Sequence, residues 1–183
     1  IDLASAAVTT SAAYTIGALT VGGTTTSSLT LGGNLTLDSS LGATGNLTIG
    51  TGGTLSAGTY TLTVSGNWDS NSGTFTQGTS SVILNGTGNL NSTGDTFYNL
   101  TVGAAGKTTT ITSNLTVSNV LTIASATGVL TDGGGGLYNI IVTGTGTPFV
   151  NNGAAVTCNQ FNYRNYTDLI TITAAGGTYN VVT

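Results

Sequence analysis

Six aspartates are the only acidic residues of this 183-residue chain, so they are the first candidates for catalysis or metal binding. They lie 26 to 37 residues apart, and the chain has no histidine or glutamate to assist proton transfer. Calcium takes about six to eight oxygen ligands, and no closely spaced run of aspartates is present; Asp132, before Gly133 to Gly136, is the best single candidate. We therefore predict no enzymatic activity, no metal and no other cofactor. All six are interpreted as solvated turn residues: Asp2, Asp38, Asp69, Asp95, Asp132 and Asp168.

Seven Asn-x-Ser/Thr sequences are the other sites with a recognisable chemistry, because such an asparagine accepts an N-linked glycan in a secreted protein. Four of them lie in the repeated phrase Asn-Leu-Thr, where the asparagine could instead hydrogen-bond a turn or stack as a ladder. Both interpretations stay open. We expect Asn85 and Asn91 to be the better acceptors, because they lie in a Gly-rich segment. The seven are Asn34, Asn46, Asn85, Asn91, Asn99, Asn114 and Asn165.

Very few charges distinguish this chain from ordinary globular proteins. Charged residues make up 4% of it, the net charge is −4, and Lys107 and Arg164 are its only cations. Two cations cannot neutralise a nucleic-acid backbone, and no apolar run approaches the roughly 20 residues that span a bilayer. We therefore predict no binding to nucleic acid and no insertion into a membrane. Cys158 is the single cysteine, so no disulfide forms within the chain.

Short segments of alternating apolar and hydroxyl residues indicate the elements that position these side chains. Leu62-Thr63-Val64 and Leu115-Thr116-Val117 are examples, and Leu, Val and Ile beside Thr suit a pleated surface. Period-two alternation bounded by Gly, Asn and Ser predicts half-buried strands. Glycine clusters such as Gly32-Gly33 disfavour helix and suit turns. The chain is therefore predicted to be all-β.

An internal repeat decides between two all-β architectures. One phrase beginning with tyrosine recurs about every forty residues, which fits two coils of a parallel β-solenoid. An antiparallel sandwich would need more Asn-Gly or Asp-Gly hairpin turns than the three present. We predict a right-handed parallel β-solenoid of roughly nine coils as a single domain over residues 1–183, with tandem antiparallel β-sandwiches as the alternative. The phrase starts at Tyr14, Tyr60, Tyr98, Tyr138 and Tyr179.

Residues 66–102, GNWDSNSGTFTQGTSSVILNGTGNLNSTGDTFYNLTV, resemble the repeats of large secreted and surface-displayed microbial proteins. These include filamentous-haemagglutinin-like adhesins and related β-helix repeat proteins, and weaker copies cover most of residues 14–183. The resemblance implies an extracellular, cell-surface location and a fibrous role without an active site. Trp68, Phe75, Phe97 and Tyr98 could form a strip that stacks on sugars, although core packing is the commoner use of such residues.

The two ends of the sequence are free of charged caps, which soluble repeat proteins usually carry. We expect residues 1–13 and 169–183 to make contacts between subunits, with Val8 meeting Tyr179, Val181 and Val182 of another copy. When head-to-tail contacts between copies do not close into a ring, they yield a filament. The predicted role is a structural subunit of an extracellular filament or stalk, assembled with copies of itself. The alternative is a surface adhesin or carbohydrate-binding module of a longer repeat protein, with glycans as partners.

Overall fold

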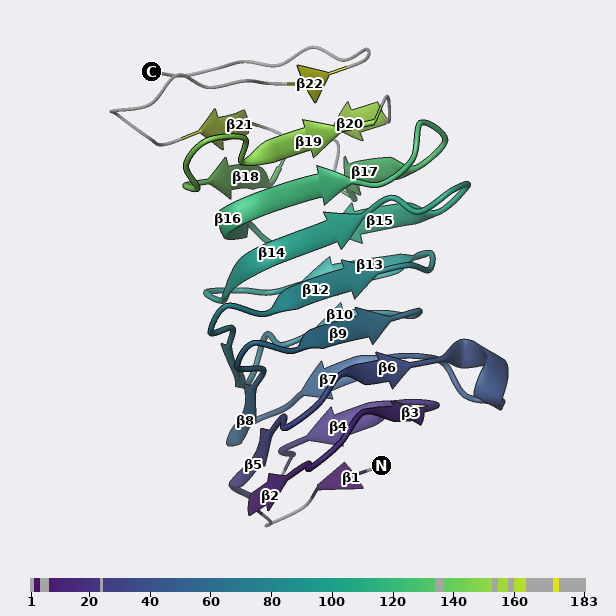
Figure 1. The fold of residues 1–183 in the computed structure, drawn as a ribbon, viewed down its shortest axis with the longest axis vertical. Coiled ribbons are helices and arrows are strands. Elements are labelled where there is room, and N and C mark those ends of the chain that lie inside the picture. The colour runs from purple at the N-terminus through teal and green to yellow at the C-terminus, as the bar shows by residue number, and fades with distance from the viewer. Residues whose placement is uncertain are drawn as a thin grey trace.

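The computed structural model describes residues 2–3, 7–23, 25–133, 137–152, 155–157, 160–163 and 173–174. These residues form three sheets that run along one long axis (Figure 1), and every strand pair within them is parallel. Sheet A contains β1 (Asp2–Leu3), β4 (Leu19–Val21), β7 (Leu47–Ile49), β10 (Trp68–Asp69), β13 (Gly88–Asn91), β15 (Thr108–Ile111), β17 (Val129–Asp132) and β20 (Ala155–Thr157). Sheet B contains β2 (Ala7–Thr9), β5 (Ser27–Thr30), β8 (Gly53–Ser56) and β11 (Thr74–Thr76).

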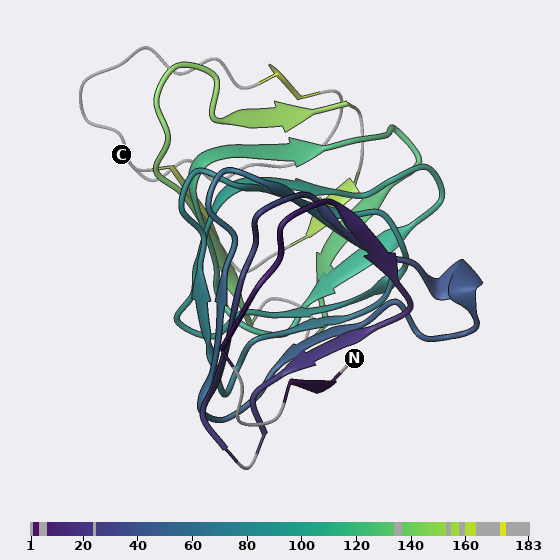
Figure 2. The same ribbon diagram turned by 60° about the horizontal axis from the view of Figure 1, so that its bottom comes forward.

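Sheet C forms the third and longest wall of the molecule. Its path is β3 (Tyr14–Ile16), β6 (Leu35–Leu37), β9 (Thr61–Val64), β12 (Ser81–Leu84), β14 (Thr96–Val102), β16 (Leu115–Ile123), β18 (Asn139–Val142) and β21 (Gln160–Tyr163). Two further strands, β19 (Phe149–Asn151) and β22 (Thr173–Ala174), pair with each other, and β19 also pairs with β16. The 3-10 helix η1 (Ser39–Leu41) projects from the loop after β6 (Figure 2).

The chain visits the three sheets in turn, so each coil stacks on the one before it. In sheet A, Leu47 pairs with Trp68, 21 residues later, and Thr108 pairs with Val129, again 21 residues later. The predicted all-β parallel solenoid is therefore confirmed, and a forty-residue repeat corresponds to two coils. Antiparallel sandwiches are excluded for the described strands, because their pairs are parallel.

The predicted number of coils was too high. The stack makes about six turns, not nine. One reason is that some coils carry long loops: Leu19 pairs with Leu47, 28 residues later, across the loop that includes η1. The prediction of nine coils assumes about twenty residues in every coil. Loops that extend from the surface make some coils longer, so the chain forms fewer of them.

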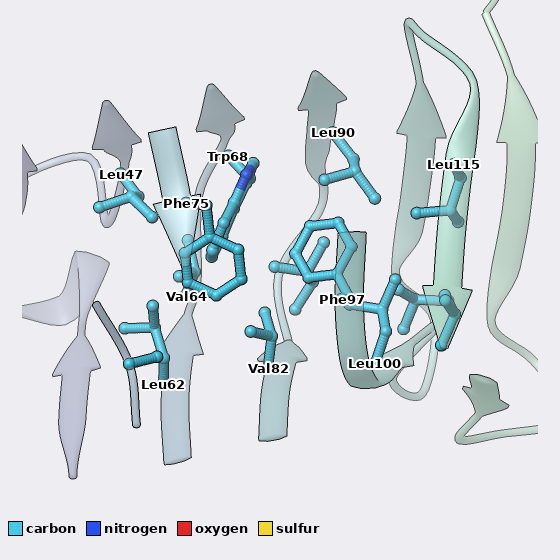
Figure 3. Close-up of a cluster of buried hydrophobic side chains, with 14 of the residues drawn as sticks. Leu47, Leu62, Val64, Trp68, Phe75, Val82, Leu90, Phe97, Leu100 and Leu115 are labelled. Carbon is cyan, nitrogen blue, oxygen red and sulfur yellow. The ribbon is translucent and has the colours of Figure 1, made fainter. Parts of the chain in front are cut away.

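Apolar side chains stack as ladders inside the rod (Figure 3), as the alternating pattern predicted. In β9, Leu62 and Val64 are fully buried, while Thr63 between them alternates out of the core. Stacked apolar residues bury surface at about 25 cal/mol per Å², so each coil stabilises the next. The inward ladder of sheet A comprises Leu19, Leu47, Trp68, Leu90 and Ile111, and that of sheet C comprises Leu35, Leu62, Val82, Leu100, Leu121 and Phe149.

The tyrosine phrase recurs in every second strand of sheet C, in β3, β9, β14 and β18. The tyrosine side chains do not share one corner of the rod. Tyr14 occupies the rung that Leu35 continues, whereas Tyr60 precedes its strand and Tyr98 lies at a bulge in β14. The repeated phrase therefore corresponds to a strand of sheet C and not to a fixed position of the tyrosine. Tyr60 and Tyr138 are partly buried against the core.

Sheet B ends at β11, part of the way up the rod. In the next coil the chain passes from β13 to β14 through a turn at Ser92–Asp95, without a strand in sheet B. The register of β14 against β16 shifts between Phe97 and Asn99, at a bulge. The described part of the chain contains no helix long and apolar enough to cross a membrane.

Candidate functional site

Each described aspartate lies in a different strand or loop. Asp38 caps η1, where its Oδ1 accepts a hydrogen bond of 2.8 Å from the amide of Ser40. The hydrogen bonds from Ser40 lower the pKa of Asp38 below its ordinary value. Asp69 is exposed and accepts from the amide of Asn71 at 3.2 Å. Both carboxylates therefore stabilise the backbone of a surface turn.

Two other aspartates are less solvated than the sequence suggested. Asp132 is 3% exposed at the inward end of the sheet A ladder, so its interpretation as a solvated residue was wrong. Its Oδ2 accepts from the amides of Leu137, at 2.8 Å, and Tyr138, at 3.4 Å, and so closes the loop that returns the chain to β18. Asp95 is half-buried and accepts from the amide of Phe75 at 3.2 Å.

No three His, Cys, Asp or Glu side chains lie close enough together to hold a metal ion among the residues that the structure describes. Each described aspartate beyond Asp2 instead binds backbone amides of its own or a neighbouring coil. Asp2 is placed by its backbone in β1, and Asp168, Cys158 and Arg164 lie outside the described residues.

Asparagines of the repeated phrase bind the coil that follows them. In three sequons the asparagine Oδ1 accepts a hydrogen bond of 2.8–2.9 Å from a backbone amide of the next coil. Asn34 accepts from Thr61, Asn46 from Asn67, and Asn114 from Asn139. Asn99 is also engaged, because its Nδ2 donates to Ser81 and its Oδ1 accepts from Asn119. These side chains act as corner ladders, which was one of the two interpretations of the sequence.

The other sequons differ in how their side chains are held. Asn85 is exposed in the turn after β12, and its backbone amide donates to the carbonyl of Val64. Asn91 is half-buried at the end of β13, and its Oδ1 accepts from Thr93 at 3.2 Å. Asn165 lies outside the described residues. Asn85 is thus the better placed of the two predicted glycan acceptors.

Asn67 extends this ladder, although no sequon marks it. Its amide donates to Asn46, and its Oδ1 accepts from the amide of Asn89 at 2.8 Å, so three successive coils are linked at one corner. Asn67 and Asn89 could not be recognised as ladder residues from the sequence, because only the register aligns them with Asn46. The available signal was an asparagine one residue before Leu47, Trp68 and Leu90 in turn.

Replacing Asn67 with alanine should lower the free energy of unfolding by about 0.5–1.5 kcal/mol, because the amide of Asn89 loses its acceptor at an exposed corner. Asn71→Ala is the matched control. It removes the same type of side chain from an exposed position in the next turn. We expect the control to change stability by no more than about 0.5 kcal/mol. Urea denaturation followed by circular dichroism measures both, and equal effects would contradict a ladder at this corner.

The predicted aromatic strip is inside the rod. Trp68 and Phe97 are fully buried and Phe75 is 3% exposed, and their rings pack with centroids 4.8–5.6 Å apart. Tyr98 is half-buried at the bulge of β14. The three buried rings therefore belong to the core and offer no surface on which a sugar ring could stack.

An apolar hollow of about 200 Å³ opens at the N-terminal end of the stack. Val8 of β2 and Ile16 of β3 line it together with the lowest residues of the inward ladders, which are Leu19, Leu29 and Leu35. Tyr14 stands at its rim and is 47% exposed. In the described residues β2 pairs only with β5 and β3 only with β6, so one edge of each strand has no partner strand.

The predicted subunit contacts are divided between described and undescribed parts of the chain. Val8 lies in β2, partly buried against the core and at the wall of the hollow. Tyr179, Val181 and Val182 lie outside the described residues. The arrangement thus places one of the four predicted interface residues at an open end of the stack.

Comparisons of the chain with models of protein families, with curated proteins and with solved structures find no match. The similarity of residues 66–102 to repeats of microbial surface proteins therefore stays a prediction. The geometry of the rod and the chemistry of its surface are what bear on function.

Proposed function

We propose that this protein is a structural subunit of an extracellular, cell-surface filament or stalk that assembles head to tail through β-strand contacts. The observation that carries the proposal is the hollow at the N-terminal end, which apolar side chains line and at which β2 and β3 each have one edge without a partner strand among the described residues. An added coil would cover both, because every coil within the chain covers the one below it in the same way. Apolar burial and backbone pairing are the two forces that this contact would use.

The low charge of the chain favours the same role. With a net charge of −4 over 183 residues, copies that stack end to end repel one another little. Asn-to-backbone hydrogen bonds join neighbouring coils within the subunit, each through one side chain and one amide. A fibre built in this way needs no bound ligand.

The adhesin alternative has less support. The aromatic residues that were candidates for sugar stacking are in the core, and binding to a glycan would need a surface elsewhere on the rod. If the protein is secreted into a glycosylating compartment, Asn85 is the residue at which we propose a glycan, since its side chain is exposed in a turn.

Substitution of Val8 by lysine tests head-to-tail assembly. We expect the unaltered protein to form rods that lengthen with concentration, measured by sedimentation velocity and electron microscopy. Val8→Lys should leave single subunits, because a charge at the wall of the hollow would have to be buried in the contact. Thr63→Lys is the control: it adds the same charge on the outer side of β9 and should leave rods unchanged.

Two results would contradict the proposal. One is a protein that remains monomeric at every concentration while binding a host or cell-wall glycan, which would favour the adhesin. The other is equal assembly of Val8→Lys and the unaltered protein, which would place the contact away from the hollow.

A further inference from the structure

The turn at Asp95 joins β13 to β14, in the coil that follows β10 to β12, and it lies where sheet B is interrupted. In lower coils, strands of sheet B pair with one another, as β8 pairs with β11. Above β11 this pairing stops, and the amide of Phe75 donates instead to Oδ1 of Asp95 at 3.2 Å. One carboxylate thus takes the place of a backbone acceptor and links two coils across the break.

The surroundings of this carboxylate favour its neutral form. Its second oxygen, Oδ2, is buried and has no hydrogen-bond partner among the protein atoms. The carboxylate binds the backbone amide of Phe75, whose ring is part of the aromatic cluster. The centroid of that ring lies 4.8 Å from that of Trp68 and 5.6 Å from that of Phe97. An ionised oxygen in such a place loses hydration without gaining a donor, which costs free energy.

The charges near this turn do not offset that cost. The elements that pack around Asp95 are β10, β11, β13, β14 and, above them, β16. They carry two titratable groups, Asp69, which is exposed on β10, and Tyr98, which is at the bulge of β14. Within the described residues the one basic side chain is that of Lys107, which is exposed in the turn just before β15. Burial raises the pKa of Asp95 above its ordinary value, and the hydrogen bond from the amide of Phe75 opposes this rise.

We infer that the Asp95 turn is an acid-stabilised junction of the rod, at which protonation of one carboxyl tightens the packing of the β13–β14 coil on the β10–β12 coil. The neutral carboxyl still accepts from Phe75 through one oxygen, and its other oxygen carries the proton without an unbalanced charge. The folded protein binds this proton more tightly than the unfolded chain does. The stability so gained is present in full below 3.8, the ordinary pKa of an aspartate, and is lost as pH rises through the folded pKa.

Asp95→Asn tests the inference, because asparagine resembles the neutral carboxyl and keeps an oxygen for the amide of Phe75. At pH 7 the variant should have a higher urea midpoint than the unaltered protein. The difference should shrink as the pH falls toward 4 and the carboxyl of the unaltered protein takes up its proton. Asp69→Asn is the control, since it removes the same charge from an exposed side chain and should not reproduce this pattern.

A direct titration makes the outcome independent of whether the variant folds. In the unaltered protein, the carboxyl carbon signal of Asp95 in NMR should titrate with a midpoint above 3.8. Protection of the Phe75 amide from hydrogen exchange, corrected for the intrinsic pH dependence, should increase as that titration proceeds. A midpoint at or below 3.8, or an Asp95→Asn variant that is less stable than the unaltered protein at pH 7, would overturn the inference.

Discussion

Replacing Trp68 with alanine is expected to lower the free energy of unfolding by about 3–5 kcal/mol. Trp68 is fully buried in the sheet A ladder between Leu47 and Leu90. Its ring packs edge-on against Phe75 and Phe97, so its removal leaves a cavity that the paired strands on either side cannot close. Its indole Nε1 also donates to Ser70 at 2.9 Å, and that hydroxyl would lose its donor.

Urea denaturation, followed by circular dichroism, measures this loss. The free energy of unfolding of a typical domain is about 5–15 kcal/mol, so Trp68→Ala should unfold at a much lower urea concentration than the unaltered protein. Leu41→Ala is the control, because Leu41 is 56% exposed on η1 and should change stability by no more than about 0.5 kcal/mol. A loss below about 1 kcal/mol for Trp68→Ala would contradict the packing of the aromatic cluster.

The alternation of apolar and hydroxyl residues was sufficient to predict the strands and the core. Leu62-Thr63-Val64 could be assigned as buried, outward and buried because a strand has a strict period of two. The recurrence of such segments was sufficient to predict stacked parallel coils, since neither helices nor hairpin turns were abundant. These features are local or periodic, so they can be recognised without knowledge of the register.

Register determined what the sequence did not reveal. Asn67 and Asn89 align with Asn46 only because coils of about 21 residues stack in register, and loops elsewhere make the spacing uneven. The interruption of sheet B after β11 has no composition signal, and so the role of Asp95 could not be predicted. Asp132 was misjudged for a similar reason, because its inward position follows from its pairing with Ile111.

Gly86→Ala is expected to cost about 3 kcal/mol, at the upper end of the effects of inserting a methyl group into a packed site. Gly86 lies in the turn after β12, and a Cβ there would overlap the backbone carbonyl of Ser65, one coil below. A backbone atom cannot move aside as the end of a side chain does. The substitution should therefore push two coils apart at a corner, where the amide of Asn85 donates to the carbonyl of Val64.

Gly94→Ala separates close packing from backbone strain. Gly94 has a φ of +83°, and no atom lies within 4 Å of the position that a Cβ would take. Alanine there would make no clash, but it would have to adopt the left-handed conformation, which costs roughly 1–2 kcal/mol. Gly86 has the opposite combination, with contact but no φ in the left-handed range. Thermal and urea denaturation of the two variants should rank Gly86→Ala as the less stable. The reverse order would mean that the coils are loosely stacked at this corner, and that turn conformation, more than contact between coils, limits which residues the rod accepts.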